Sequence, residues 1–152
     1  MELISKTIQL HSPNIYGNEI KYLKECINLN YLTFGRHSEL FLEKIKKVTN
    51  SKYPALVHSC TSGLYLCLKI AKVKKNDEVL VPSITFIASI NVITYCNANP
   101  IFMDVDEYCN IDLKKTEDFI LKETFFKNGC TYNKKTKRKV SSIIIVHTFG
   151  NV

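Results

Sequence analysis

Residues 53–70 read Tyr-Pro-Ala-Leu-Val-His-Ser-Cys-Thr-Ser-Gly-Leu-Tyr-Leu-Cys-Leu-Lys-Ile and combine three patterns. An apolar run at 55–57 precedes a small polar cluster at 58–63, and apolar residues then continue beyond strand length. This order predicts a strand, a tight turn and a buried helix. Because the first N–H groups of a helix face any anion placed there, residues 59–63 are a candidate phosphate cup. The alternative is an ordinary strand-to-helix connection capped by Ser59 or Thr61.

Length and composition favour a single globular domain. The chain has 152 residues, of which 45% are apolar and 23% are charged, a balance that permits a real core. It contains no apolar run of about 18 residues, and its amino terminus lacks the pattern of a signal peptide. We therefore expect a cytoplasmic protein with no membrane partner.

Cysteine spacing and charge give two further expectations. The six cysteines include no Cys-x-x-Cys pair, so the sequence predicts neither a zinc site nor a disulfide framework. The formal charge of +7 comes largely from one run, in which Lys134, Lys135, Lys137, Arg138 and Lys139 supply five positive charges within six residues. Nucleic-acid binding by this run is not favoured, because only Tyr132 among the nearby residues is an aromatic suited to base stacking.

The hydrophobic pattern alternates between helices and strands. Helical spacing predicts helices at 18–29, 38–48, 85–96 and 112–121, and short apolar runs predict strands at 79–81, 101–103 and 142–146. In the first two helices we expect an inward apolar face formed by Ile20, Leu23, Ile27, Leu40, Phe41, Ile45 and Val48. The helix at 85–96 is expected to be buried on most sides. The Asn128-Gly129 pair predicts a hairpin within a solvated, lysine-rich excursion at 124–139.

Such alternation predicts an α/β fold with three layers, a mostly parallel sheet with helices on both faces. Ligands then bind beyond the carboxyl ends of the strands. Polar residues follow each expected strand, at 58–61, 83–86, 104–106 and 147–150. Asp104 and Asp106 are open to a metal or acid-base interpretation, but two aspartates after a strand more often cap turns.

Five blocks in this order resemble one family. They are Ser-Cys-Thr-Ser-Gly-Leu, Asp-Glu-Val-Leu-Val-Pro-Ser-Ile-Thr-Phe-Ile-Ala-Ser, Asn-Pro-Ile-Phe-Met-Asp-Val-Asp, Asn-Ile-Asp and Val-His-Thr-Phe-Gly, all within residues 17–152. The chain resembles the DegT/StrS sugar aminotransferases, pyridoxal-phosphate enzymes of the aspartate aminotransferase fold. The segment before Val-His-Thr-Phe-Gly is similar to the subgroup that acts on UDP-linked 4-keto sugars in bacillosamine- and legionaminate-type pathways.

The resemblance implies a binding site for pyridoxal 5'-phosphate. Its phosphate would be held by the Thr61 hydroxyl and by the backbone of Cys60 and Ser62, at a helix amino terminus. Phe86 matches the aromatic residue that covers the pyridine ring, with a core phenylalanine as the alternative, and His147 lies near the pocket or only holds the following loop. Cys60 stands where the family has glycine, so we expect weaker cofactor binding.

The resemblance also implies that the Schiff-base lysine and the carboxylate that pairs with the pyridine nitrogen follow the Val-His-Thr-Phe-Gly block. None of the 21 basic residues stands at the position of that lysine, so no catalytic residue is assigned. We expect an arm at 1–16 and an incomplete large domain at 17–152, with the small domain absent. The front part of a gene product, active only when completed, fits this pattern.

The expected function is that of an amino-terminal fragment of a nucleotide-sugar aminotransferase. The complete enzyme would transfer an amino group from glutamate to a nucleotide-linked keto sugar for surface polysaccharide or glycan biosynthesis, as a homodimer. The alternative is a non-catalytic module that binds a nucleotide sugar or the cofactor. We expect no nucleic-acid partner and no metal.

Overall fold

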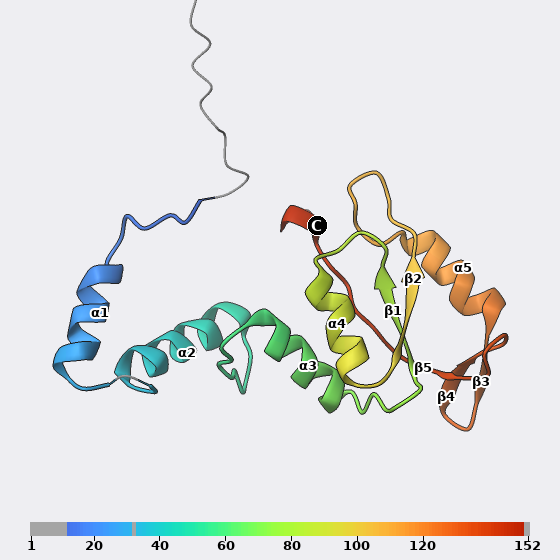
Figure 1. The fold of residues 1–152 in the computed structure, drawn as a ribbon, viewed down its shortest axis with the longest axis horizontal. Helices are drawn as coiled ribbons and strands as arrows, with labels where there is room; N and C mark the ends of the chain where they lie inside the picture. The colour runs from blue at the N-terminus through green and yellow to red at the C-terminus, as the bar shows by residue number, and fades with distance from the viewer. Residues whose placement is uncertain (1–11, 32, 151–152) are drawn as a thin grey trace, which may run out of the picture. The chain divides into compact units, whose positions relative to one another are not determined.

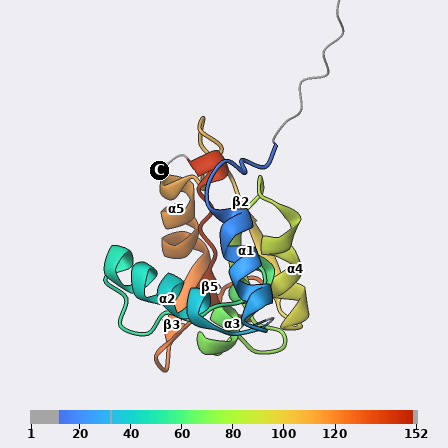
Figure 2. The same cartoon turned by 90° about the vertical axis from the view of Figure 1, so that its left-hand side faces the viewer.

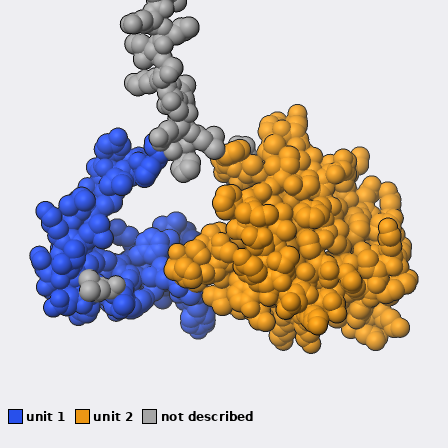
Figure 3. All heavy atoms as spheres, viewed as in Figure 1, with its two compact units in different colours: residues 1–56 blue, residues 57–152 orange. Residues whose placement is uncertain are grey.

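The computed structural model describes residues 12–31 and 33–150, and these divide into two compact units, 1–56 and 57–152 (Figure 3). We call them unit 1 and unit 2 and describe each by itself. Of the arm expected at 1–16, residues 1–11 lie outside the described residues, and residues 12–16 carry no helix or strand.

Unit 1 contains two helices, α1 (Glu19–Asn28) and α2 (Arg36–Thr49) (Figure 1). Both lie close to their expected positions, but the expectation that their apolar faces pack inward was wrong. No residue of either helix is buried, and Ile27 keeps 63% of its side chain exposed. An apolar stripe becomes buried only where another element covers it, and no described element of unit 1 covers this one.

Unit 2 is built on a five-stranded sheet in the order β2-β1-β5-β4-β3. The strands are β1 (Glu78–Pro82), β2 (Asn99–Met103), β3 (Thr124–Lys127), β4 (Cys130–Asn133) and β5 (Lys139–Ile143). β1 pairs in parallel with β2 and with β5, whereas β4 pairs antiparallel with β3 and β5. The sheet therefore has a parallel part, as expected, extended at one side by an antiparallel hairpin.

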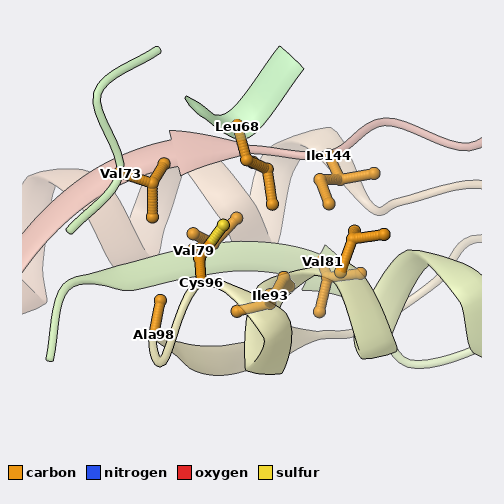
Figure 4. Packing of buried hydrophobic residues seen from close by; sticks show 9 residues of the cluster. Leu68, Val73, Val79, Val81, Ile93, Cys96, Ala98 and Ile144 are labelled. Atoms are coloured by element: carbon orange, nitrogen blue, oxygen red, sulfur yellow. The ribbon is translucent and has the colours of Figure 1, made fainter. Parts of the chain in front are cut away.

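The strand β1 is the centre of the core, and all five of its residues are buried. Val79 and Val81 point to one face, where they pack with Leu68, Ile93 and other apolar residues (Figure 4). Leu80 lies in a second cluster with Met103 and Ile111. Alternate residues of a strand point to opposite faces, so one short apolar run supplies both halves of the core.

Three helices cover the two faces of this sheet. α3 (Cys60–Ile70) and α4 (Ile87–Tyr95) contribute to the cluster around Val79, whereas Phe119 of α5 (Leu113–Glu123) packs against the cluster around Leu80. Figure 2 shows α4 and α5 on opposite sides of the strands. The expected arrangement of a sheet with helices on both faces is confirmed for unit 2. A short 3-10 turn, η1 (Thr148–Gly150), ends the described chain.

Two helices are less buried than their sequences predicted. In α3 only Leu68 is buried, and Ile70 is 79% exposed. In α4 the buried residues are Ser89, Val92 and Ile93, while Tyr95 is 57% exposed. Each helix is covered by the sheet and by its neighbour on one side only, so the rest of its apolar surface stays open.

The strand expected at residues 55–57 is not present, because these residues carry no strand and pair with none of the five described strands. A strand exists only through hydrogen bonds to a neighbouring strand, and an apolar run cannot specify that neighbour. The helix after this run is present, so the prediction was right for the helix and wrong for the strand.

The last strand lies three residues earlier than expected. β5 spans Lys139–Ile143 instead of 142–146, and its first four residues are only half-buried. Pairing with both β1 and β4 fixes this position, whereas the apolar run continues beyond it to the buried Ile144. The hairpin predicted within the excursion is confirmed, but its strands β3 and β4 belong to the sheet. Asn128 and Gly129 join these strands with φ of 51° and 74°, the positive values that such tight hairpin turns require.

Candidate functional site

Three segments of unit 2 leave the sheet at one edge. β2, β1 and β5 are parallel, so the residues after Met103, Pro82 and Ile143 share the carboxyl edge. Figure 1 shows β1 pointing toward this edge. The Ser83 N–H donates to the Met103 carbonyl at 2.9 Å and so continues the ladder into the loop. The expected gathering of the post-strand segments is therefore observed for these three.

A pocket of about 360 Å³ lies at this edge and contains two of the predicted site residues. Its wall is formed by Ile84, Thr85, Phe86, Val146, His147, Thr148 and Phe149. Phe86 is the N-cap residue of α4 and is 79% exposed, so its ring is not part of the core. The Thr85 hydroxyl donates to Ser89 Oγ at 3.1 Å, which ties this loop to the first turn of α4. The structure thus brings Phe86 and His147 into one pocket.

The loop after β2 holds the segment that carries His147. The Thr148 N–H donates to Asn110 Oδ1 at 3.2 Å, and the Thr148 hydroxyl donates to the Cys109 carbonyl at 2.8 Å. Cys109 has a φ of 61° and Phe149 a φ of 53°, a left-handed conformation that is uncommon for residues other than glycine. These contacts fix the backbone beside the pocket. Sequence reasoning missed the role of Asn110, although the Asn-Ile-Asp block contained it.

The two aspartates after β2 have structural roles. Asp106 Oδ1 accepts from the N–H groups of Tyr108 and Asn110, both at 2.9 Å, which caps a turn. Asp104 Oδ2 accepts from Lys115 Nζ at 2.7 Å, and this hydrogen bond and the carboxylate charge raise the pKa of Lys115. Among the described residues there is no group of three or more side chains suited to a metal ion. The capping interpretation is confirmed for Asp106, whereas the Asp104 side chain pairs with Lys115.

The phosphate cup occupies the start of α3. Ser59 is the N-cap residue, and its Oγ accepts from the Ser62 N–H at 3.2 Å. The Gly63 N–H donates to the Ser59 carbonyl at 3.1 Å. Within the described part of the chain, the N–H groups of Cys60 and Thr61 have no protein acceptor. The capping interaction and two free donors are therefore both present, so the two interpretations of this turn are compatible.

The phosphate cup and the pocket both lie toward the carboxyl edge of the sheet. The loops that follow α3 and α4 meet at the opposite edge, where the Asn76 N–H donates to the Asn97 carbonyl at 2.9 Å. Both helices therefore end at the amino edge and begin toward the carboxyl edge. Cys60, Thr61 and Ser62 are not among the residues that line the pocket. The structure thus gives two groups, the cup and the pocket, at the starts of two adjacent helices.

One neighbour of the cup was not identified from the sequence as a site residue. His58 Nε2 lies 3.0 Å from Ser62 Oγ, and Ser62 Oγ lies 3.0 Å from Ser59 Oγ. The ring of His58 is exposed, while both serines are half-buried. The only sequence signal was the place of His58 in the polar cluster before the helix.

The lysine-rich run lies away from this edge. It forms the turn between β4 and β5, at the amino end of β5, where Asn133 Oδ1 accepts from the Lys135 N–H at 2.8 Å. Phe125 and Tyr132 stack with ring centroids 5.6 Å apart, and Lys137 Nζ lies 5.8 Å from the Phe125 ring.

None of the helices in the described ranges is long and apolar enough to span a membrane.

Comparison with known proteins gives a consistent result. The model of the DegT/DnrJ/EryC1/StrS aminotransferase family matches residues 13–152. GDP-perosamine synthase of Escherichia coli O157:H7 is 29% identical over 147 residues, which cover 96% of this chain and 36% of that protein. The spore coat polysaccharide biosynthesis protein SpsC of Bacillus subtilis (strain 168) is 32% identical over 113 residues, or 74% of this chain and 29% of that protein. The chain therefore spans about a third of the length of these curated relatives.

A solved structure supports the same fold. A Streptococcus pneumoniae protein assigned as a sugar aminotransferase, Spr1654 in its PLP form, superposes with a TM-score of 0.67. The two are 27% identical, and the match covers 73% of this chain and 29% of that chain. The fold is that of the pyridoxal-phosphate-dependent aminotransferases, and pyridoxal phosphate is the cofactor of the family.

Proposed function

Because the chain belongs to the DegT/DnrJ/EryC1/StrS aminotransferase family, we propose that residues 1–152 hold the cofactor phosphate in a nucleotide-sugar aminotransferase. One observation carries the proposal: the first turn of α3 presents the free N–H groups of Cys60 and Thr61 beside several hydroxyls. A phosphate ester needs several donors and a favourable helix dipole, and this donor set supplies both.

The individual roles follow from these positions. The Thr61 hydroxyl and the N–H groups of Cys60 and Thr61 bind the phosphate oxygens, while the Ser62 N–H holds the turn through Ser59. The exposed ring of Phe86 would cover the pyridine ring, and His147 lines the same pocket. When bound, pyridoxal phosphate supplies an electron sink for amino-group transfer. The Cys60 side chain narrows the approach to the phosphate and weakens binding relative to glycine.

The proposed reaction of the complete enzyme transfers an amino group from glutamate to a nucleotide-linked keto sugar, for surface polysaccharide or glycan biosynthesis. The names of the relatives in Escherichia coli and Bacillus subtilis support a sugar substrate. We propose a UDP-linked 4-keto sugar, with a GDP-linked sugar as the competing substrate. We also propose a cytoplasmic homodimer. Residues 1–152 alone bind without transferring, because the resemblance assigns the lysine and the ring carboxylate to later positions.

The binding proposal is tested with pyridoxine 5'-phosphate, which has no aldehyde and cannot label the lysine run covalently. Calorimetric titration of the chain should show binding of this ester and none of pyridoxine, which lacks the phosphate. Thr61→Val should weaken binding about tenfold, the value of one hydrogen bond to a charged group. Thr94→Val removes a hydroxyl that bonds only the Asn91 carbonyl of α4 and should leave affinity unchanged. Equal affinity for ester and alcohol would contradict the proposal.

The reaction is tested with glutamate labelled by ¹⁵N and with UDP- and GDP-linked 4-keto sugars, followed by mass spectrometry. We expect no label on either sugar with residues 1–152 alone. Label on a sugar would show that the catalytic lysine lies within these residues. Tight binding of a nucleotide sugar without cofactor binding would favour the non-catalytic binding module instead.

A further inference from the structure

Three side chains form a hydrogen-bonded chain at the rim of the phosphate cup. Ser62 Oγ lies 3.0 Å from His58 Nε2, 3.4 Å from His58 Nδ1 and 3.0 Å from Ser59 Oγ. Ser59 Oγ also accepts from the Ser62 N–H at 3.2 Å. We infer that His58 is a positioning residue that decides, through Ser62, whether the Ser59 hydroxyl donates to the bound phosphate. This inference rests on the proposed function of the cup.

The hydrogen bonds that link His58, Ser62 and Ser59 are able to run in two directions, because each serine hydroxyl has a single proton to donate. In the first direction His58 Nε2 carries no proton and accepts from the Ser62 hydroxyl. The Ser59–Ser62 contact is then made by the Ser59 proton. Ser59 has no proton left for a ligand, and its remaining lone pair faces the anion. This direction disfavours phosphate.

In the second direction His58 Nε2 carries a proton and donates it to Ser62 Oγ. The Ser62 hydroxyl then donates to Ser59 Oγ, which also accepts from the Ser62 N–H. The proton of Ser59 is now free to point toward an outside acceptor. Ser59 joins the free N–H groups of Cys60 and Thr61 as a third donor, so this direction favours phosphate.

Binding of a phosphate ester and protonation of His58 are therefore linked. Histidine is the side chain type that ordinarily gains a proton between about pH 5 and about pH 8, so this linkage is tested by measuring affinity across that range. The imidazolium form has a proton on Nε2 at all times and adds a positive charge near the anion. The neutral form has one only in one of its two tautomers. Affinity for a phosphate ester should therefore be higher at the acidic end of this range.

The other titratable groups on α3, on α4 and at the C-cap of α4 are Cys60, Tyr65, Cys67, Lys69, Tyr95 and Cys96. Of these, only Cys60 lies at the start of a helix, and the others lie farther toward the amino edge of the sheet. Lys69 Nζ lies 6.0 Å from the Tyr65 ring, about two turns from the cup, and burial raises the pKa of the Cys96 thiol. Cys60 lies in the cup itself, so the test uses a Cys60→Ser background. The phosphate ester itself takes up a proton at about pH 6. This effect is the same for every variant, so it cancels when the variants are compared.

The test is calorimetric titration with pyridoxine 5'-phosphate at about pH 6 and about pH 7.5, which bracket the change in imidazole charge. Two variants are compared with the background chain. His58→Gln keeps an N–H donor to Ser62 but does not titrate, and Ser62→Ala keeps the imidazole but breaks the chain. Between about pH 7.5 and about pH 6, we expect the affinity of the background chain for the ester to rise. This rise should be about fivefold larger than the rise in either variant, because one hydrogen bond is worth about that factor. At about pH 7.5, His58→Gln should bind more tightly than the background chain.

Each outcome decides a separate point. If the background chain and both variants bind the ester with the same pH profile, the cup stands and the inference about His58 is overturned. If the pH profile is lost in His58→Gln but kept in Ser62→Ala, charge alone is responsible and the relay through Ser62 is overturned. If the unmodified chain binds no ester at either pH, the proposed function fails and the inference fails with it.

A second measurement does not depend on the variants and guards against misfolding. The ¹⁵N shifts of the His58 ring report the proton on Nε2 in the unmodified chain. Addition of pyridoxine 5'-phosphate at about pH 7 should increase the protonated fraction of Nε2. An unchanged ring signal at saturating ester would overturn the inference, even where binding itself is observed.

Discussion

The two units contain helices whose apolar residues differ in burial. Ile27 of α1 in unit 1 is 63% exposed, whereas Ile93 of α4 in unit 2 is 0% exposed. Ile27 lies on the apolar face of an amphipathic helix and Ile93 lies in a helix that is apolar on most sides, but only Ile93 meets a sheet and a second helix. The difference teaches that an amphipathic pattern specifies which face is able to pack. Whether the face is buried depends on the element that covers it.

The strongest test of this comparison is a matched truncation. Ile93→Ala should lower the free energy of unfolding by about 2–5 kcal/mol, because it leaves a cavity in the core of unit 2. Ile27→Ala should change it by less than about 0.5 kcal/mol, because the side chain is already in water and alanine favours a helix. Urea unfolding followed by circular dichroism measures both. A large loss for Ile27→Ala would mean that α1 is covered in solution.

A smaller effect is expected from polar contacts. In unit 2, Asn133 Nδ2 donates to the buried carboxylate of Glu78 at 2.9 Å. Asn133→Ala leaves that carboxylate without its partner and should cost about 1–3 kcal/mol. In unit 1, the contact between His37 and Glu25 at 3.1 Å is partly exposed, so Glu25→Gln should cost at most about 1 kcal/mol. Equal costs in the same urea assay would remove the distinction between the units.

The smallest effect concerns helix starts. Asp112 caps α5 in unit 2 by accepting from the Lys115 N–H at 2.9 Å, whereas Asn18 makes no side-chain cap on α1 in unit 1. Asp112→Ala should lower the thermal stability by about 1 kcal/mol, the usual value of such a cap. Asn18→Ala should change it by only a few tenths of a kcal/mol. A larger loss for Asn18→Ala in thermal scans would show a contact that the fold does not explain.

Features decided by local chemistry were predictable from the sequence. Ser59 before an apolar run predicts a capped helix, and the Asn128-Gly129 pair predicts a tight turn, because both depend on a few neighbouring residues. The presence of Phe86 and His147 in one pocket was also predictable, because both residues follow strands whose carboxyl ends meet at one edge of the sheet.

Features that depend on a distant partner were not predictable. Residues 55–57 have a strand-like pattern, but none of the described strands pairs with them. β5 starts where β4 pairs with Lys139 and β1 pairs with Val140, and an apolar run cannot encode these partners. The contact of His58 with Ser62 depends on side-chain rotamers, and the Asn110–Thr148 contact joins residues 38 positions apart.

The most direct test of the central claim follows the amide signals of the chain as pyridoxine 5'-phosphate is added. Two-dimensional ¹H–¹⁵N spectra separate the signals of the phosphate cup from those of the lysine run at 134–139. We expect the largest shifts at the amides of Cys60 and Thr61, which have no acceptor within the described residues. Shifts confined to residues 134–139 would instead show charge-driven association at the far edge of the sheet and would contradict the account.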